Sequence, residues 1–201
     1  CAFSVPGLAI AFDAISCQIA STSTSSSLFS GTIANNAVDN NNNANADGIY
    51  IRAQGAGALT TTISYNNFTK IKRDGIEIVN IGSGTMNATI TGNNIDLTAA
   101  SRYGISLLAG LSTADLSSIC AQIGGVFAEK NTINLHGFGV NDIRINEVST
   151  INIKGLVPDP GSAANVVTYL TGQNTLVGTV SVSGTSFNSC FPLFHFLIQT
   201  V

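Results

Sequence analysis

The sequence predicts an all-β fold: a right-handed parallel β-helix of about four to five coils, with irregular capping ends and one short helix. Three observations predict it. Gly48, Gly75 and Gly104 open similar segments and stand 27 and 29 residues apart, and periods of about 20–50 residues are typical of solenoids. Apolar and polar residues alternate within each copy, which is the period of a strand. The copies contain no stretch with the period of a helix.

Three stretches of sequence superpose, and a fourth copy is more degenerate. They read "GTIANNAVDNNNNANADGIYIRA", "TTISYNNFTKIKRDGIEIVN", "ATITGNNIDLTAASRYGISLLA" and "VFAEKNTINLHGFGVNDIRINEV". If each copy forms one coil, equivalent strands stack and equivalent apolar residues form ladders along the axis. We expect two such ladders, Ile33/Ile63/Ile90 and Ile49/Ile76/Ile105.

The ends of the chain depart from the repeat. Residues 1–28 form an apolar segment followed by a Ser/Thr-rich linker or cap, residues 29–155 hold the β-helix repeats, and residues 156–201 form a C-terminal capping segment with an apolar tail. Within that last segment "SAANVVTYLTGQN" predicts a short helix, with Ser162 as its N-cap and Gly172 near its end. Open solenoid ends recruit strands, so the chain ends also predict self-assembly.

The composition limits the kinds of partner. Charged residues make up only 9 % of the chain and the net charge is −3, so the basic face that a nucleic-acid binder needs is not expected. No segment reaches the roughly 18 consecutive apolar residues of a membrane helix, so we expect no transmembrane segment. We find no metal-binding or cofactor motif and expect neither group.

The four cysteines, Cys1, Cys17, Cys120 and Cys190, are widely spaced. An even number of cysteines in a chain this poor in charge favours disulfides in an oxidising compartment; the alternative is four buried thiols. Cys17 can pair with Cys1 and Cys120 with Cys190, but the other two connectivities stay open. A lipid-modified Cys1 is a further alternative, for which the cleavage context is missing.

Several segments resemble a known group of proteins. "ISCQIASTSTSSSLFSGTIANNAVDN", the repeated "TISYNNF…DGIEI" and the later "ICAQIGGVFAEKNTINLHG" look like the C-terminal portion of large bacterial surface and secreted proteins with right-handed β-helix repeats, such as autotransporter passengers and adhesins. The frame from Cys120 to Cys190, with "NTLVGTV" inside it, is similar to their closing module. The resemblance implies an extracellular, non-enzymatic surface module and identifies no receptor. We expect a structural or adhesive role, extracellular or on a bacterial cell surface, with a glycan or host-surface ligand. The apolar tail after Cys190 departs from the pattern.

The repeated Asp-Gly-Ile motif allows two interpretations. Asp47-Gly48, Asp74-Gly75 and Gly104 predict a turn, because Asp bonds locally and Gly accepts positive φ; Tyr103 replaces the acid in the third copy. Glu77 would then be an ordinary solvated residue, and no catalytic residue is assigned.

The alternative is an enzyme on the same scaffold. A polysaccharide lyase or glycoside hydrolase of the tailspike kind would use Asp47, Asp74 and Arg144. Acids stacked on neighbouring coils stand close enough to act as the pair that glycoside cleavage requires.

Asparagines recur beside the isoleucine ladder. We expect a structural ladder of Asn36, Asn67, Asn94 and Asn131, with a glycan-binding face as the alternative reading. Two N-glycosylation sequences occur, at Asn67 and at Asn87; an Asn67 in the inward ladder could not carry a sugar, whereas Asn87 is expected in a loop.

One further alternative rests on threonine. Thr32, Thr62 and Thr89 align just before the ladder isoleucines. An aligned threonine column on a flat face is the minimum that an ice-binding solenoid requires.

Overall fold

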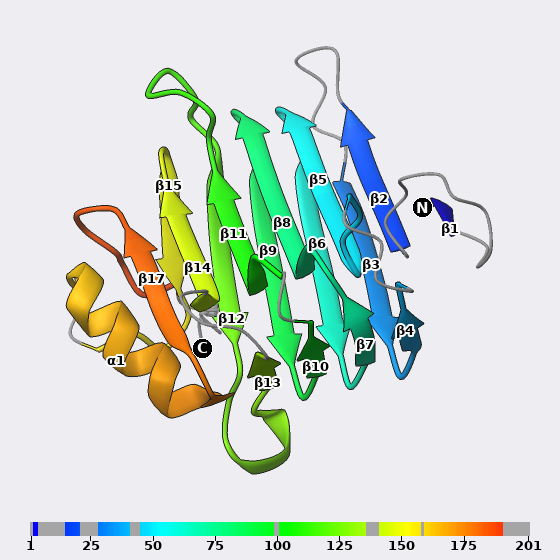
Figure 1. Ribbon diagram of the computed structural model, residues 1–201. Coiled ribbons are helices and arrows are strands. Elements are labelled where there is room, and N and C mark those ends of the chain that lie inside the picture. The colour runs from blue at the N-terminus through cyan, green and yellow to red at the C-terminus, as the bar shows by residue number, and fades with distance from the viewer. Residues whose placement is uncertain are drawn as a thin grey trace, which may run out of the picture.

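A computed structural model describes residues 2–3, 15–20, 28–40, 45–98, 101–135, 141–157 and 159–190. These residues form a parallel β-solenoid of about four turns, in which three sheets run along one axis (Figure 1). The predicted fold class is confirmed.

The first sheet has seven strands in the order β1-β2-β5-β8-β11-β14-β17. Its strands are β1 (Ala2–Phe3), β2 (Ile15–Ala20), β5 (Ile49–Gly55), β8 (Asp74–Gly82), β11 (Tyr103–Ala109), β14 (Asn141–Glu147) and β17 (Thr179–Ser183). Every neighbouring pair is parallel except β1 with β2, which is antiparallel.

The second and third sheets have five strands each, all parallel. The second sheet contains β3 (Leu28–Ala34), β6 (Ala58–Ser64), β9 (Thr85–Thr91), β12 (Ser118–Ile123) and β15 (Thr150–Ile153). The third contains β4 (Ala37–Asp39), β7 (Asn67–Ile71), β10 (Asn94–Leu97), β13 (Thr132–Leu135) and β16 (Thr175–Leu176). Each coil contributes one strand to each of the three sheets, so equivalent residues of successive repeats become neighbours.

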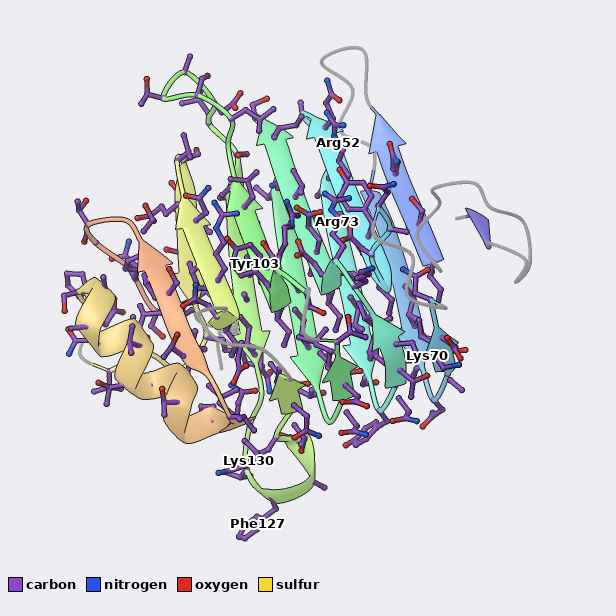
Figure 2. All side chains as sticks on the ribbon, viewed as in Figure 1. Arg52, Lys70, Arg73, Tyr103, Phe127 and Lys130 are labelled. Carbon is purple, nitrogen blue, oxygen red and sulfur yellow. A yellow bond between two sulfur atoms is a disulfide. The ribbon has the colours of Figure 1, made fainter. Side chains whose placement is uncertain are left out.

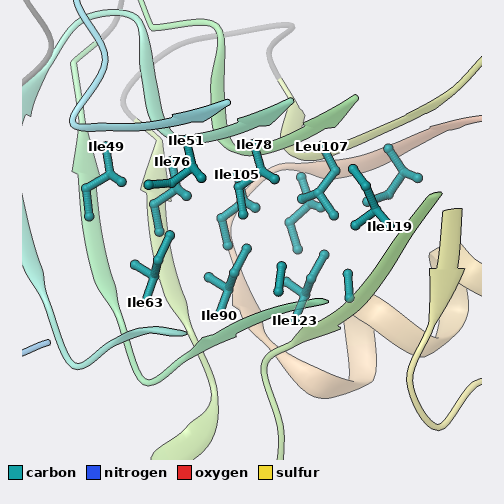
Figure 3. Close-up of a cluster of buried hydrophobic side chains, with 14 of the residues drawn as sticks. Ile49, Ile51, Ile63, Ile76, Ile78, Ile90, Ile105, Leu107, Ile119 and Ile123 are labelled. Carbon is teal, nitrogen blue, oxygen red and sulfur yellow. The ribbon is translucent and has the colours of Figure 1, made fainter. Parts of the chain in front are cut away.

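The predicted isoleucine ladders line the core. Ile49, Ile76 and Ile105 are paired in register in the first sheet, and Ile63 and Ile90 in the second. All five are fully buried, and the two ladders face each other across the core (Figure 3). Burial of one such side chain stabilises the fold by roughly 1.5–3 kcal/mol, so the repeated isoleucine explains why the coils stack.

The C-terminal end of the solenoid is closed. Helix α1 (Ala163–Gln173) has the predicted N-cap, because the Ser162 hydroxyl accepts from the Asn165 N–H and the Asn165 side chain accepts from the Ser162 N–H. Val166 and Leu170 of α1 are buried against the core. The predicted helix is therefore confirmed, and it caps the last coil.

Among the described residues, the first coil is less buried than the coils that follow it. Leu28 is 82 % exposed, and Ile33 is only partly buried, whereas its ladder partners Ile63 and Ile90 are fully buried. Strands β3 and β4 are the outermost strands of their sheets. The linker at 21–27 and the apolar tail at 191–201 lie outside the described residues.

A short 3₁₀ helix, η1 (Phe127–Glu129), leads from β12 to β13. The predicted boundary at residue 155 falls between β15 and α1.

Candidate functional site

The charged residues of the repeat meet where the chain enters the first sheet. Asp47 and Asp74 occupy equivalent places in successive coils, and Tyr103 pairs in register with Asp74 in the third. Asp74 and Gly75 are the first two residues of β8 rather than part of a turn. Gly104 likewise lies within β11, so the predicted turn is wrong for the second and third copies, whereas Asp47 and Gly48 lie just before β5, with Gly48 at a bend.

Each aspartate is bonded to the coil that follows it. The Oδ1 of Asp47 accepts a 3.0 Å hydrogen bond from the backbone N–H of Asp74, and Arg73 Nη1 lies 3.2 Å from Asp47 Oδ2. Arg102 donates from Nε and Nη2 to the two carboxylate oxygens of Asp74, at 3.2 and 2.8 Å. Both aspartate side chains are fully buried, so the carboxylates connect coils.

Glu77 completes the cluster. Its side chain is only 12 % exposed, and Arg73 Nη2 donates to it at 3.3 Å. The expectation that Glu77 is simply solvated is wrong, because Arg73 and Arg102 cover it from two coils. We call Asp47, Arg73, Asp74, Glu77 and Arg102 the Asp–Arg cluster.

The electrostatics of the Asp–Arg cluster favour one bound proton. Burial, together with repulsion from Asp74 and Glu77, raises the pKa of Asp47 to about 8. Burial also raises the pKa of Asp74, although the bonds from Arg102 oppose that shift. A protonated Asp47 leaves two carboxylates facing two guanidinium groups, which is a balanced arrangement at neutral pH.

The three carboxyl groups of the cluster could supply oxygen ligands to a cation. One oxygen from each of Asp47, Asp74 and Glu77 lies within 4.8 Å of the others, and oxygen ligands suit hard cations. Two guanidinium groups already occupy the space around these oxygens, so the donor set fits an ion-pair network better than a metal site.

Arg144 lies on β14, two strands from Glu77 in register. Its guanidinium stacks 5.0 Å from the centroid of the Tyr103 ring, and Arg102 lies 5.9 Å from the same ring. Arg73 and Tyr103 lie over the first sheet (Figure 2). Of the residues that the enzyme alternative would use, Asp47 and Asp74 lie together in the Asp–Arg cluster, and Arg144 shares the Tyr103 ring with Arg102 of that cluster.

Sequence reasoning missed the partners of the aspartates. Arg73 and Arg102 each stand directly before the aspartate position of their own copy, as "RD" and "RY", but each pairs with the aspartate of the preceding copy. The arginine that recurs before the aspartate position was the sequence feature that could have indicated these ion pairs.

The glycines of the motif allow close contact between coils. A Cβ on Gly48 would lie 2.6 Å from the Gly75 carbonyl oxygen, and one on Gly75 would lie 2.5 Å from that of Gly104. None of the three has a positive φ. The predicted need for a strained backbone is wrong; the stacking distance, not the local conformation, requires glycine.

The asparagine ladder exists, but two of its predicted members are wrong. The side chain of each ladder residue accepts from the residue one coil earlier: Asn66 from Asn36, Asn93 from Asn66, and Asn131 from Asn93. Asn131 then donates to Asn174. Asn67 and Asn94 stand one position later, because the ladder asparagine follows the ladder isoleucine by three residues in each of the first three copies.

Asn67 and Asn94 form a separate, exposed pair, in which Asn94 Nδ2 donates to Asn67 Oδ1 at 2.8 Å. Asn67 is therefore accessible to a glycan. Asn87 is also exposed, but it lies in strand β9 and not in the expected loop.

The predicted Cys120–Cys190 disulfide is present. It ties the last described segment back to β12, and Phe187 in that segment is buried. Cys17 is also disulfide-bonded; Cys1, its proposed partner, lies outside the described residues.

Comparisons with family models, with curated proteins and with solved structures found no match to this chain. The fold by itself places the chain in the class of parallel β-solenoids. Among the described residues, no helix combines the length and apolar character needed to cross a membrane.

Proposed function

We propose that this chain is a non-enzymatic structural or adhesive module of a bacterial extracellular or cell-surface protein. The observation that carries the proposal is the burial of both repeated aspartates, Asp47 and Asp74, and their bonding to the next coil. A carboxylate that must reach a substrate needs an accessible oxygen, and these two side chains have none.

The disulfide between Cys120 and Cys190 supports the proposed location, because such bonds persist in oxidising compartments. A stack of short coils locked by ladders of isoleucine and asparagine is rigid along its axis. Rigidity of this kind suits a rod that holds a binding surface away from a cell.

The exposed Leu28 on edge strand β3 supports self-assembly. Leu28 is 82 % exposed at the outermost strand of the second sheet, and edge strands template pairing with another chain. We propose that two copies associate through β3. In multi-angle light scattering, the oxidised full chain should give a dimer that Leu28→Lys converts to monomer. Leu111→Lys, on a loop residue that is 65 % exposed, should leave the dimer intact, and a wild-type monomer at high concentration contradicts the assembly proposal.

The adhesive role is tested by binding. Fluorescently labelled full chain is applied to immobilised glycans and to host-cell surfaces. The same glycans are also incubated with the chain in solution, and their lengths are measured afterwards. The proposal expects saturable binding and ligands of unchanged length. Absence of binding to every surface contradicts the adhesive role.

One observation favours a second candidate, a polysaccharide-degrading enzyme. A carboxyl group with a pKa of about 8, such as Asp47, carries its proton at neutral pH and has the protonation state of a general acid. Shortening of a glycan in the sizing experiment would favour this candidate.

A further inference from the structure

The outer surface of the second sheet carries a two-dimensional array of polar side chains. Thr32, Thr62 and Thr89 stand in register on β3, β6 and β9, which confirms the alignment expected from the sequence. A second column, two residues earlier on the same strands, was not expected; it consists of Ser30, Thr60 and Asn87. We call these six residues the hydroxyl face.

The polar groups of the hydroxyl face are free to bind. Ser30, Thr32, Thr60 and Asn87 are exposed, and Thr62 and Thr89 are partly exposed. Within the described part of the chain, none of the six side chains makes a hydrogen bond. Other hydroxyls are used internally: Ser101 donates to Ile71 and Ser117 to Asn80.

The hydroxyl face also lacks charge. Strands β3, β6 and β9 read LFSGTIA, ALTTTIS and TMNATIT, without a single charged residue. The first sheet, by contrast, carries Arg52, Glu77 and Arg144 on its strands. An ionic or strongly hydrated ligand therefore has nothing to pair with on the second sheet.

The spacing of the hydroxyl face matches ordered water. Neighbouring strands stand about 4.7–4.9 Å apart. A hydrogen bond between hydroxyl oxygens is about 2.7–2.8 Å long, so two oxygens bonded to one tetrahedral water lie about 4.5 Å apart. Threonine holds its hydroxyl and methyl groups in few rotamers, which keeps this spacing fixed before any ligand arrives.

We propose that the hydroxyl face binds the surface of ice, an activity independent of the adhesive role proposed above. The six positions contain no aromatic ring on which a sugar could stack, and free hydroxyls at the spacing of a water lattice favour water as the ligand. The array ends at β12, where Cys120 follows Asn87 in register and carries the disulfide to Cys190. The face therefore spans three strands.

The test uses the full, oxidised chain made in a host that does not glycosylate Asn87. Thermal hysteresis and the shape of single ice crystals are measured at about millimolar protein. The wild type should produce a freezing gap and faceted crystals. Thr62→Lys, at the centre of the first column, should abolish both, because a charged, flexible side chain disrupts the lattice contact.

The matched control is Thr168→Lys on the exposed surface of α1, which adds the same charge elsewhere and should retain both effects. Circular dichroism of each variant establishes that its sheet content is unchanged. Round crystals and no freezing gap with the wild type overturn the proposal, whatever the variants do. Retention of the effect in a folded Thr62→Lys, or binding of a neutral polysaccharide in place of ice, overturns it as well.

Discussion

Arg102 holds both carboxylate oxygens of Asp74, a residue 28 positions earlier and one coil away, at 3.2 and 2.8 Å. Arg73 also contacts the aspartate of the preceding coil, but through a single contact, from Nη1 to Oδ2 of Asp47 at 3.2 Å. Each arginine directly precedes the aspartate position of its own copy in the sequence, but it contacts the aspartate of the preceding coil. This relation decides how the acids of the repeat should respond to substitution.

Arg102→Ala should destabilise the fold at neutral pH. The change leaves the carboxylate of Asp74 buried without its cation; breaking a fully buried pair costs about 3–5 kcal/mol, and the half-exposed Arg102 should give a smaller loss, about 2–3 kcal/mol. Urea unfolding at pH 7 measures it. Lys72→Ala, next to Arg73 in sequence, should change the free energy of unfolding by less than about 0.5 kcal/mol; equal losses in the two variants would show that the Asp74 pair is unimportant.

Stability should fall as the pH rises from about 4 to about 8. The pKa of Asp47 is about 8 in the folded chain, against 3.8 for a free side chain, so the folded state holds a proton that the unfolded state has lost. The free energy of unfolding then decreases with pH, by up to about 1.4 kcal/mol per unit. Asp47→Asn, which keeps the acceptor for Asp74, should flatten the slope. An unchanged slope in that variant would place the proton elsewhere.

Asn93→Ala should be far more harmful than Asn94→Ala. The first change leaves the backbone and side-chain donors of Asn66 without their acceptor in the buried ladder, at about 1–3 kcal/mol for each group. The second removes an exposed amide and should cost less than about 1 kcal/mol. Thermal unfolding of the two variants side by side measures the difference. Similar values would mean that the ladder register described here is unimportant for stability.

Gly75→Ala should destabilise the fold by about 1–3 kcal/mol or more, because overpacking of a rigid site forces the surroundings to move. The added Cβ would meet the Gly104 carbonyl oxygen at 2.5 Å and Ile95 Cγ2 at 2.6 Å. Gly172→Ala in helix α1 has open space around it and should stabilise by up to about 1 kcal/mol. Chemical denaturation reports both; a neutral Gly75→Ala would contradict the close approach of the coils.

The sequence was sufficient to predict the architecture. Strand alternation and the repeat period place Ile63 above Ile90 and Ile76 above Ile105, and the capping signal at Ser162 places the helix. These features depend on local patterns, which are repeated in each copy and therefore reinforce one another.

The site was less predictable, because its contacts join different coils. Alignment on the Asn-Asn pair shifted the ladder to Asn67 and Asn94, whereas counting three residues from the ladder isoleucine gives Asn66 and Asn93. The pairing of Arg102 with Asp74 and the steric need for Gly75 follow from how one coil lies on the next. Neither relation has a signature within a single repeat.

The aspartates of the repeat connect coils, and our central proposal is that they do no chemistry. The most direct test incubates the full, oxidised chain with a panel of acidic and neutral polysaccharides and measures new reducing ends and unsaturated sugar ends. Our account predicts no product above background for the wild type. Product release that disappears in a folded Asp74→Asn or Asp47→Asn variant would contradict it.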